Sequence, residues 1–336
     1  MRIAVDAMGG DSPAMVVQGA LQAALEWGMD ITLVGQRQVI DALIQEQKEQ
    51  VACRIEHCPE MIAMDEPPVK AIRKKKKASI RVAFELVKRG EADAVVSAGN
   101  SGATLAAGVL VLGKLKAIER PAFAGIFPGE KGDVIIIDVG ANVDCRAEHL
   151  FHFGLMAEAL ATTCLNMIQP RVGLLNIGQE GGKGNEQVRL AHDLFKSSAL
   201  NFIGNVEGRD IFSGEVQIIV CDGFVGNVAL KLSEGLTESL IGIIKHAMAG
   251  LTEEQMAIHK RKGGFWEIIR KMDYAEYGGA PVLGINGVGI VCHGSSSARA
   301  VKNAVKMADH YAEQHMPERL AQYFETIQNQ LPQSEN

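Results

Sequence analysis

The sequence predicts an α/β protein of three layers, in which a largely parallel sheet lies between two layers of helices. Two observations predict this fold. Short apolar runs that end in Gly, Asn or Asp alternate with longer helical patterns along the chain. The runs are apolar throughout, which is typical of strands that helices bury on both faces. Strands that alternate with helices form the units from which parallel sheets are built.

Six such strand-and-helix units follow one another. In each pair below, the first range is the strand with its following turn and the second is the helical pattern. The pairs are 2–11 with 14–28, 30–35 with 39–47, 92–102 with 103–117, 133–142 with 147–165, 171–186 with 187–198, and 216–227 with 228–248.

The domain organisation is predicted to be simple. No linker rich in Pro or Ser divides the chain, so residues 1–336 are expected to form a single α/β catalytic domain. Residues 236–277 differ from the rest, because long helical patterns there are interrupted by "RKGG". We expect this stretch to be a helical excursion that protrudes from the α/β body.

Composition excludes several classes of protein. The net charge is -6, 47% of the residues are apolar and only 5% are aromatic, a balance that argues against a nucleic-acid-binding protein. None of the six cysteines forms a Cys-x-x-Cys pair, which favours reduced thiols in a cytoplasmic protein. The longest apolar run is shorter than the roughly 20 residues that span a bilayer.

The turns after the predicted strands are rich in glycine and small polar residues. In a parallel sheet the carboxyl ends of the strands share one edge, so we expect these turns to line a single anion-binding crevice. The phosphate-loop, nucleophile-elbow and dinucleotide motifs are absent, and no cofactor is expected. Four carboxylates near the crevice are candidates for a divalent metal, although helix capping is the more common role for such groups: Asp138, Glu186, Glu207 and Asp222.

At these turns the sequence resembles the PlsX family, the acyl-acyl-carrier-protein:phosphate acyltransferases. The motifs span nearly the whole chain in order. They are "RIAVDAMGGD" (2–11), "DEPPVKAIRKKKKAS" (65–79), "ADAVVSAGNSGA" (92–103), "DVGANVD" (138–144), "RVGLLNIGQEGGKGNE" (171–186), "NFIGNVEGRDI" (201–211), "CDGFVGNVALK" (221–231), "YGGAPVLGINGV" (277–288) and "HGSSSARA" (293–300).

The resemblance implies a fold like that of the phosphate acetyl/butyryltransferases and isocitrate-type dehydrogenases, and a homodimer. It implies transfer of a long acyl group from acyl carrier protein to inorganic phosphate, which gives acyl phosphate for phospholipid synthesis. A downstream glycerol-phosphate acyltransferase is a further expected partner. Three alternatives remain open: a donor that is a coenzyme A thioester, a nucleotide-dependent dehydrogenase of related fold, and a nonenzymatic basic binding module.

Site residues follow from this reaction. Lys183, Asn185 and His293 are the predicted catalytic residues. Lys183 would bind phosphate or the developing oxyanion, and His293 would protonate the leaving thiolate. The predicted substrate-binding residues share a place in the polar turns after strands: Gly99, Asn100, Ser101, Gly102, Gly140, Asn142 and Asn227.

A basic block stands out in this acidic chain. The five cations are Arg73, Lys74, Lys75, Lys76 and Lys77. Pro67 and Pro68 are predicted to begin a helix, Ser79 is predicted to cap the next one, and Gly90 to end it. The block would then lie exposed near the crevice. We expect it to dock the strongly acidic carrier protein.

The excursion carries an apolar stripe flanked by cations, a pattern typical of a helix at a lipid surface. The predicted membrane contacts are Phe265, Trp266, Ile268 and Ile269. A dimer interface or a core stripe remains the alternative. The expected localisation is cytoplasmic, with peripheral association with the membrane.

Overall fold

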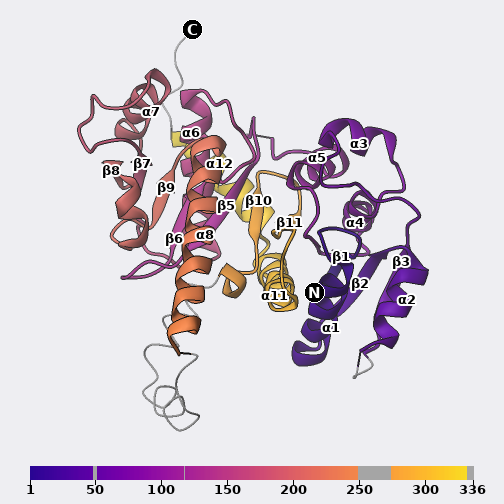
Figure 1. Ribbon diagram of the computed structural model, residues 1–336. Helices are drawn as coiled ribbons and strands as arrows, with labels where there is room; N and C mark the ends of the chain where they lie inside the picture. Colours follow the sequence, from indigo (N-terminus) through magenta and orange to yellow (C-terminus); the bar gives the residue numbers. More distant parts are fainter. Residues whose placement is uncertain (48–50, 117, 249–273, 331–336) are drawn as a thin grey trace.

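The computed structural model describes residues 1–47, 51–116, 118–248 and 274–330, which form an 11-stranded sheet between two layers of helices (Figure 1). The order across the sheet is β3-β2-β1-β4-β11-β10-β5-β6-β9-β7-β8. The strands are β1 (Arg2–Asp6), β2 (Asp30–Gly35), β3 (Arg54–His57), β4 (Ala94–Ser97), β5 (Ala122–Phe127), β6 (Val134–Ile137), β7 (Val172–Leu175), β8 (Phe202–Val206), β9 (Ile218–Val220), β10 (Ala280–Leu283) and β11 (Val288–Val291).

The sheet consists of two parallel halves that run in opposite directions. Strands β3, β2, β1, β4 and β11 are parallel to one another, and so are β6, β9, β7 and β8. Between the halves, β10 is antiparallel to both β11 and β5, and β5 is antiparallel to β6. The expected largely parallel sheet is confirmed. The expectation that all the polar turns share one edge is wrong, because the three antiparallel pairings reverse the second half.

Helices cover both faces, as the three-layer prediction requires. One face carries α1 (Pro13–Trp27), α2 (Arg37–Gln45), α6 (Ala147–Thr163), α7 (Glu186–Lys196), α11 (Ala298–Glu313) and α12 (Met316–Gln330); the other carries α3 (Pro68–Lys74), α4 (Ser79–Lys88), α5 (Ser101–Val111) and α8 (Gly223–Met248). In β6, Ile135 and Ile137 enter the first core while Ile136 enters the second. The strands are apolar along their whole length because helices bury both faces of the sheet.

The local signals around the basic block act largely as predicted. Pro68 begins α3, where its fixed φ suits the first turn. Gly90 lies just beyond α4 with a φ of 70°, a left-handed conformation that glycine adopts without strain. The prediction for Ser79 is wrong by one position. Ala78 is the N-cap residue, and Ser79 is the first helical residue and buried.

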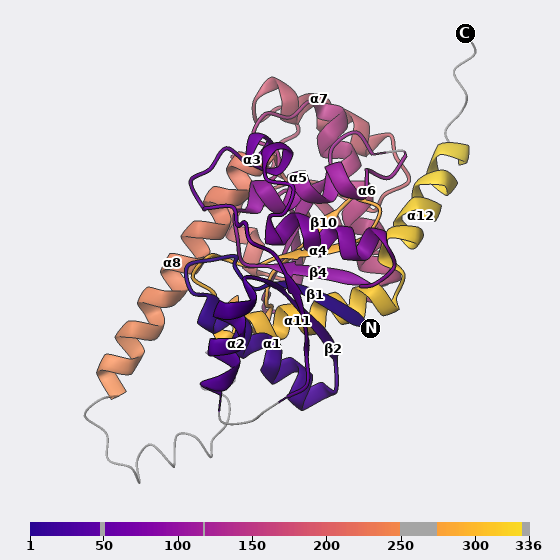
Figure 2. The ribbon, with the colours of Figure 1, turned by 90° about the vertical axis from the view of Figure 1, so that its right-hand side faces the viewer.

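The C-terminal segment joins the two halves of the molecule. Its helix α11 packs against α1, where Lys302 forms an ion pair with Glu26 at 2.8 Å. Helix α12 packs against α6, and Arg319 donates to the carbonyl of Thr163. Figure 2 shows α12 and α8 on opposite sides of the sheet. One continuous stretch of chain therefore covers the first half and then the second.

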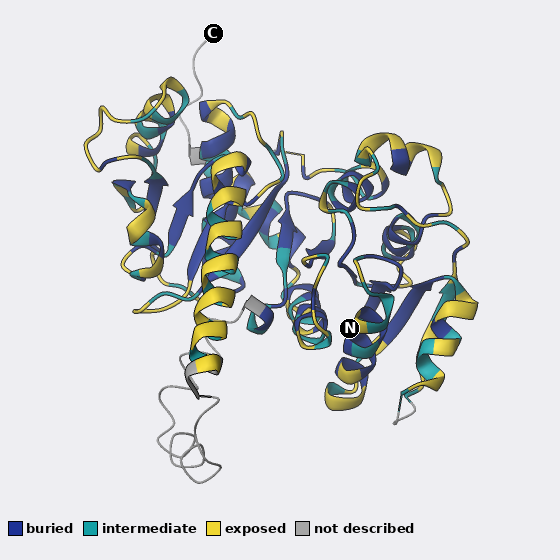
Figure 3. Cartoon of the chain, viewed as in Figure 1, coloured by how far each residue is buried: buried dark blue, intermediate teal, exposed yellow. Residues whose placement is uncertain are grey.

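Helix α8 extends beyond the body and is largely exposed (Figure 3), and it carries an exposed apolar stripe. Leu232 is 70% exposed and Ile243 is 65% exposed. The predicted start of the excursion at residue 236 falls inside α8, which runs without a break from 223 to 248. The predicted membrane contacts Phe265, Trp266, Ile268 and Ile269 lie outside the described residues. Across the residues that are described, none of the helices has the length and apolar character needed to span a bilayer.

Candidate functional site

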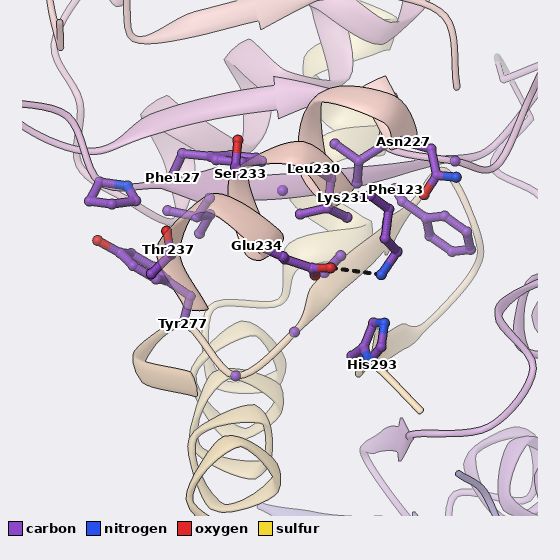
Figure 4. Close-up of a pocket in the computed structure, with 18 of the residues that line it drawn as sticks. Phe123, Phe127, Asn227, Leu230, Lys231, Ser233, Glu234, Thr237, Tyr277 and His293 are labelled. Carbon is purple, nitrogen blue, oxygen red and sulfur yellow. Dashed lines mark hydrogen bonds and ion pairs between the residues drawn. The ribbon is translucent and has the colours of Figure 1, made fainter. Parts of the chain in front are cut away.

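A pocket of about 660 Å³ lies between β5 and α8, on the face of the sheet that carries α3, α4 and α5 (Figure 4). It brings together four of the predicted site residues: Ser101, Gly140, Asn227 and His293. They come from the start of α5, the turn after β6, helix α8 and the turn after β11. The two reversed halves of the sheet thus both contribute, because the pocket lies over the central strands that join them.

Ser101 lies at the start of α5, and its position depends on Asn100. The Asn100 side chain accepts a hydrogen bond from the Ala103 N–H at 3.0 Å and donates to the carbonyls of Met64 and Glu66. The N–H groups of the first helical residues, Ser101 and Gly102, have no partner within the helix and carry the positive end of its dipole. Asn100 therefore caps and fixes the loop, while Ser101 lines the pocket. Gly99 is also held, because its N–H donates to the Ser97 hydroxyl at 3.1 Å.

The turn after β6 is organised by the buried carboxylate of Asp138. It accepts hydrogen bonds from the backbone N–H groups of Gly140, Ala141 and Asn142, at 2.7–3.1 Å. The Asn142 side chain also donates to Asp138 and to the Pro121 carbonyl. Burial raises the pKa of Asp138, although these hydrogen bonds act to lower it. The predicted substrate-binding role of Gly140 and Asn142 stays a prediction, because in this arrangement their amides bind Asp138.

His293 presents one ring nitrogen to the pocket. Its Nδ1 lies 2.7 Å from the Ser295 hydroxyl oxygen and accepts the Ser295 N–H at 3.2 Å. In a neutral imidazole with an accepting Nδ1, the proton is on Nε2. The exposed His293 side chain can therefore donate a hydrogen bond from Nε2 toward the pocket.

Lys231 is a pocket cation that the sequence reasoning missed. Its ammonium lies 2.7 Å from the Glu234 carboxylate, on the side of the pocket where His293 also lies (Figure 4). Asn227, Lys231 and Glu234 are spaced by four and three residues, so they share one face of α8. That spacing within "GNVALKLSEG" was the signal that could have identified Lys231, once α8 was known to cover the crevice.

Lys183 and Asn185 are not brought to this pocket. Both are exposed in the loop between β7 and α7. The Asn185 side chain accepts the Val188 N–H at 2.9 Å and so caps α7. The loop is held by Asn176, which donates to the Lys183 carbonyl at 3.0 Å. The catalytic roles of Lys183 and Asn185 stay predictions.

The other candidate carboxylates act mainly as caps. Glu207 caps the short 3-10 helix η1 (Gly208–Phe212), and Asp222 accepts the Val225 N–H at 2.8 Å at the start of α8. Glu186 is the first residue of α7, where its charge suits the positive helix end. Among the described residues, no group of three His, Cys, Asp or Glu side chains is placed to hold a metal ion.

The basic block adjoins the pocket loop. Arg73, Lys74, Lys76 and Lys77 are exposed. Lys75 is different, because its ammonium contacts the Glu66 carboxylate at 2.6 Å and the Met61 carbonyl at 2.9 Å. This hydrogen bond lowers the pKa of Glu66. Since the Glu66 carbonyl accepts from Asn100, Lys75 supports the loop that presents Ser101.

Two solved structures have a similar fold. A phosphotransacetylase from Streptococcus pyogenes has a TM-score of 0.63 at 16% identity, over 93% of this chain and 94% of that chain. A branched-chain phosphotransacylase from Enterococcus faecalis V583 has a TM-score of 0.59 at 13% identity, over 93% and 99%. The chain has the fold seen in these two phosphotransacylases.

Sequence relatives identify the family. The family model described as "Fatty acid synthesis protein" matches residues 1–319. The chain is 49% identical over 323 residues to the "Phosphate acyltransferase" of Nitratidesulfovibrio vulgaris (strain DP4), which covers 95% of this chain and 94% of that protein. For the "Phosphate acyltransferase" of Geotalea daltonii the identity is 47%, over 98% and 97%. The chain belongs to this phosphate acyltransferase family and is an acyltransferase.

Proposed function

We propose that the enzyme transfers a long acyl group from acyl carrier protein to inorganic phosphate, giving acyl phosphate for phospholipid synthesis. The observation that carries this proposal is the composition of the pocket. One end holds Ser101, Asn227, Lys231 and His293, and the remainder is a mostly apolar groove along β5. Such a pocket suits a reaction between an anion and the carbonyl of an apolar chain.

The chemistry needs positioning more than a strong base. The second pKa of phosphate is about 6, so the dianion is already nucleophilic at neutral pH. A phosphate oxygen attacks the thioester carbonyl, and the carbonyl oxygen becomes an oxyanion. Lys231, Asn227 and the first N–H groups of α5 can neutralise these charges. Lys183 would add a second cation if its loop approached the pocket.

Collapse of the tetrahedral intermediate breaks the carbon–sulfur bond and releases a thiolate. His293 can donate a hydrogen bond from Nε2 to the departing sulfur, and the thiolate then takes a proton from solvent, so the carrier protein leaves as a free thiol. Holding the two reactants in one pocket itself contributes strongly to the rate, because it converts a bimolecular encounter into an effectively intramolecular step.

The exposed cations favour a protein donor. Arg73, Lys74, Lys76 and Lys77 lie beside the loop that presents Ser101, on a chain whose net charge is -6. An acidic carrier protein would be repelled by most of this enzyme and attracted to that block. A small coenzyme A thioester is the alternative donor.

Turnover with each donor tests the proposal. The enzyme is incubated with phosphate and either palmitoyl-acyl carrier protein or palmitoyl-coenzyme A, and free thiol and acyl phosphate are measured. We expect both products in equal amounts, formed faster from the carrier-protein donor. Faster turnover with palmitoyl-coenzyme A would show that the donor is a coenzyme A thioester and not acyl carrier protein. Absence of acyl phosphate with both donors would overturn the reaction.

The proposed setting is a cytoplasmic homodimer that associates peripherally with the membrane and passes acyl phosphate to a glycerol-phosphate acyltransferase. The exposed apolar stripe of α8 supports an association surface, because large contiguous apolar patches usually mark interfaces. Sedimentation with anionic vesicles tests whether the predicted membrane contacts, and not only a protein interface, bind lipid. Loss of vesicle binding in Trp266→Ala and Ile268→Glu would support the lipid contact, and unchanged binding would exclude it.

A further inference from the structure

The pocket has two walls that run side by side. Strand β5 forms one wall, with Phe123 at one end and Phe127 at the other. Helix α8 forms the opposite wall, where Leu230, Ser233 and Thr237 line the pocket. In Figure 4, Phe123 and Asn227 lie together at one end, and Phe127, Ser233 and Thr237 lie toward the other. The pocket is therefore an elongated groove.

Polarity changes along this groove. The charged and hydrogen-bonding groups Asn227, Lys231 and His293 gather near Phe123 (Figure 4). The pocket lining as a whole is mostly apolar, and toward Phe127 it is aromatic and aliphatic carbon together with Glu130, Thr237 and Tyr277. Ser233 adds little polarity, because its hydroxyl donates to the Ala229 carbonyl within α8 at 2.7 Å. A ligand with one polar end and a long apolar remainder matches this gradient.

Phe212 lines the groove at the end where Phe127 lies. Its ring meets Phe127 edge to face, with ring centroids 6.3 Å apart and an interplanar angle of 65°. The backbone behind it is fixed, because the Phe212 carbonyl accepts the Glu130 N–H at 2.9 Å. Tyr277 lies at the same end and donates from its hydroxyl to Asp133 at 3.3 Å. These contacts hold Phe212 and Tyr277 in place at this end of the groove.

We propose that the acyl chain lies in this groove, with its carbonyl near Asn227 and its tail against Phe212, so that Phe212 limits the chain length. The inference rests on the proposed function. From Phe123 to Phe127 a strand extends about 13 Å, which matches roughly ten atoms of an extended chain. The groove can thus hold most of a long acyl chain away from water.

Blocking the groove tests the location. Ser233→Phe places a ring between the walls, whereas Ser239→Phe makes the same change at an exposed position of α8 that does not line the pocket. With palmitoyl donors, we expect Ser233→Phe to lower kcat/KM by about fourfold for each methylene group that can no longer be buried. Butyryl donors should be nearly spared, and Ser239→Phe should resemble the wild type. Equal losses for butyryl and palmitoyl donors would overturn the location.

Opening the end wall tests the length limit. Phe212 is 43% exposed, so Phe212→Ala removes the stop at modest cost to the core. Relative kcat/KM for stearoyl over lauroyl donors should rise by about tenfold or more, because the added methylenes gain a place to be buried. A preference identical to that of the wild type would overturn the role of Phe212.

Direct binding separates this inference from the proposed function. Displacement of a fluorescent fatty acid by palmitate is measured for the wild type, Ser233→Phe and Ser239→Phe. If palmitate binds more weakly only to Ser233→Phe, the groove is supported. This holds even if no donor yields acyl phosphate, in which case only the proposed reaction is rejected. If Ser233→Phe binds palmitate as tightly as the wild type does, and the wild type forms acyl phosphate, the proposed reaction is kept and the acyl groove is rejected.

Discussion

The Lys231–Glu234 pair places a cation at the polar end of the pocket, and its removal is the most direct test of charge stabilisation there. We expect Lys231→Ala to lower kcat by about a hundredfold, on the scale of losing an oxyanion donor. Steady-state assays with palmitoyl-acyl carrier protein measure this, with circular dichroism to confirm folding. Lys196→Ala, at an exposed position of α7, is the matched control.

Lys183 carries a separate prediction because the structure places it outside the pocket. If it neutralises phosphate or the oxyanion, Lys183→Ala should also lower turnover by about a hundredfold in a folded protein. The same assay compares it with Lys231→Ala. Near-normal turnover for Lys183→Ala would leave Lys231 as the pocket cation and withdraw Lys183 from the mechanism.

Asp6 is a buried carboxylate at the end of β1, and it predicts a pH dependence of stability. Burial raises its pKa, although hydrogen bonds from Ser79 and Ser97 act to lower it. The unfolded chain loses this proton near pH 3.8 while the folded protein retains it. The free energy of unfolding should therefore fall as pH rises from about 4 through the folded pKa, and then level off.

Urea unfolding of wild type and Asp6→Asn across that pH range checks the sign. Asn keeps an oxygen acceptor for Ser97 but has no titratable proton, so the variant should show a shallower fall. Asp65→Asn, at an exposed position, is the control and should follow the wild type. Parallel pH curves for wild type and Asp6→Asn would show that Asp6 titrates similarly in both states.

At the scale of elements, α3 joins the basic block to the pocket loop, and the structure changes how docking should be tested. Lys75 supports Glu66, so its replacement would disturb the loop as well as the surface charge. The exposed pair Lys74 and Lys76 is the cleaner target. We expect Lys74→Glu with Lys76→Glu to raise KM for acyl carrier protein by about tenfold, because charge complementarity steers the encounter.

Salt and a small donor provide the controls for docking. Added salt should weaken wild-type use of the carrier protein, since it screens exposed charges over about 10 Å at 0.1 M. The reaction of a small acyl thioester should be nearly unaffected by the double variant. Lys88→Glu with Lys196→Glu changes the net charge equally at other sites. A similar rise in KM for acyl carrier protein in that control would show that the effect comes from net charge alone.

Helix α12 predicts a large stability effect at one side chain. Phe324 is 2% exposed and contacts the His152 ring of α6, with centroids 6.2 Å apart. Phe324→Ala should lower the free energy of unfolding by about 3–5 kcal/mol, the range for truncating a buried aromatic residue. Chemical denaturation measures it, and Glu325→Ala on the exposed side should stay within about 0.5 kcal/mol of wild type. A small loss for Phe324→Ala would mean that α12 is only loosely docked.

For the whole molecule, periodicity predicted the layers well but could not predict the direction of the second half. The run 30–35 coincides with β2, and the runs around 134–137 and 218–220 contain β6 and β9. Direction was set by β5 and β10. Each is antiparallel to the strand that follows it in sequence, and the two pair with each other across a long stretch of chain. Local pattern holds little information about such pairings.

The same limit explains the mixed outcome at the site. Ser101, Gly140, Asn227 and His293 were found because polar turns mark strand ends, and all four line the pocket. Lys183 was chosen as the cation of a Gly-rich turn at a predicted strand end, and that turn was expected to share one edge with the others. Lys231 was overlooked because its helix crosses the groove, and only the tertiary structure shows which helix face is turned inward.

The position of β10 and β11 has a consequence for biosynthesis. They are made last among the strands described, yet they lie between β4 and β5 in the middle of the sheet. While the ribosome is still adding the residues before 280, β4 and β5 have open edges that invite pairing with other chains. Nascent chains should therefore depend on chaperones until translation is almost complete, and a premature stop before residue 280 should yield aggregates rather than a smaller folded protein.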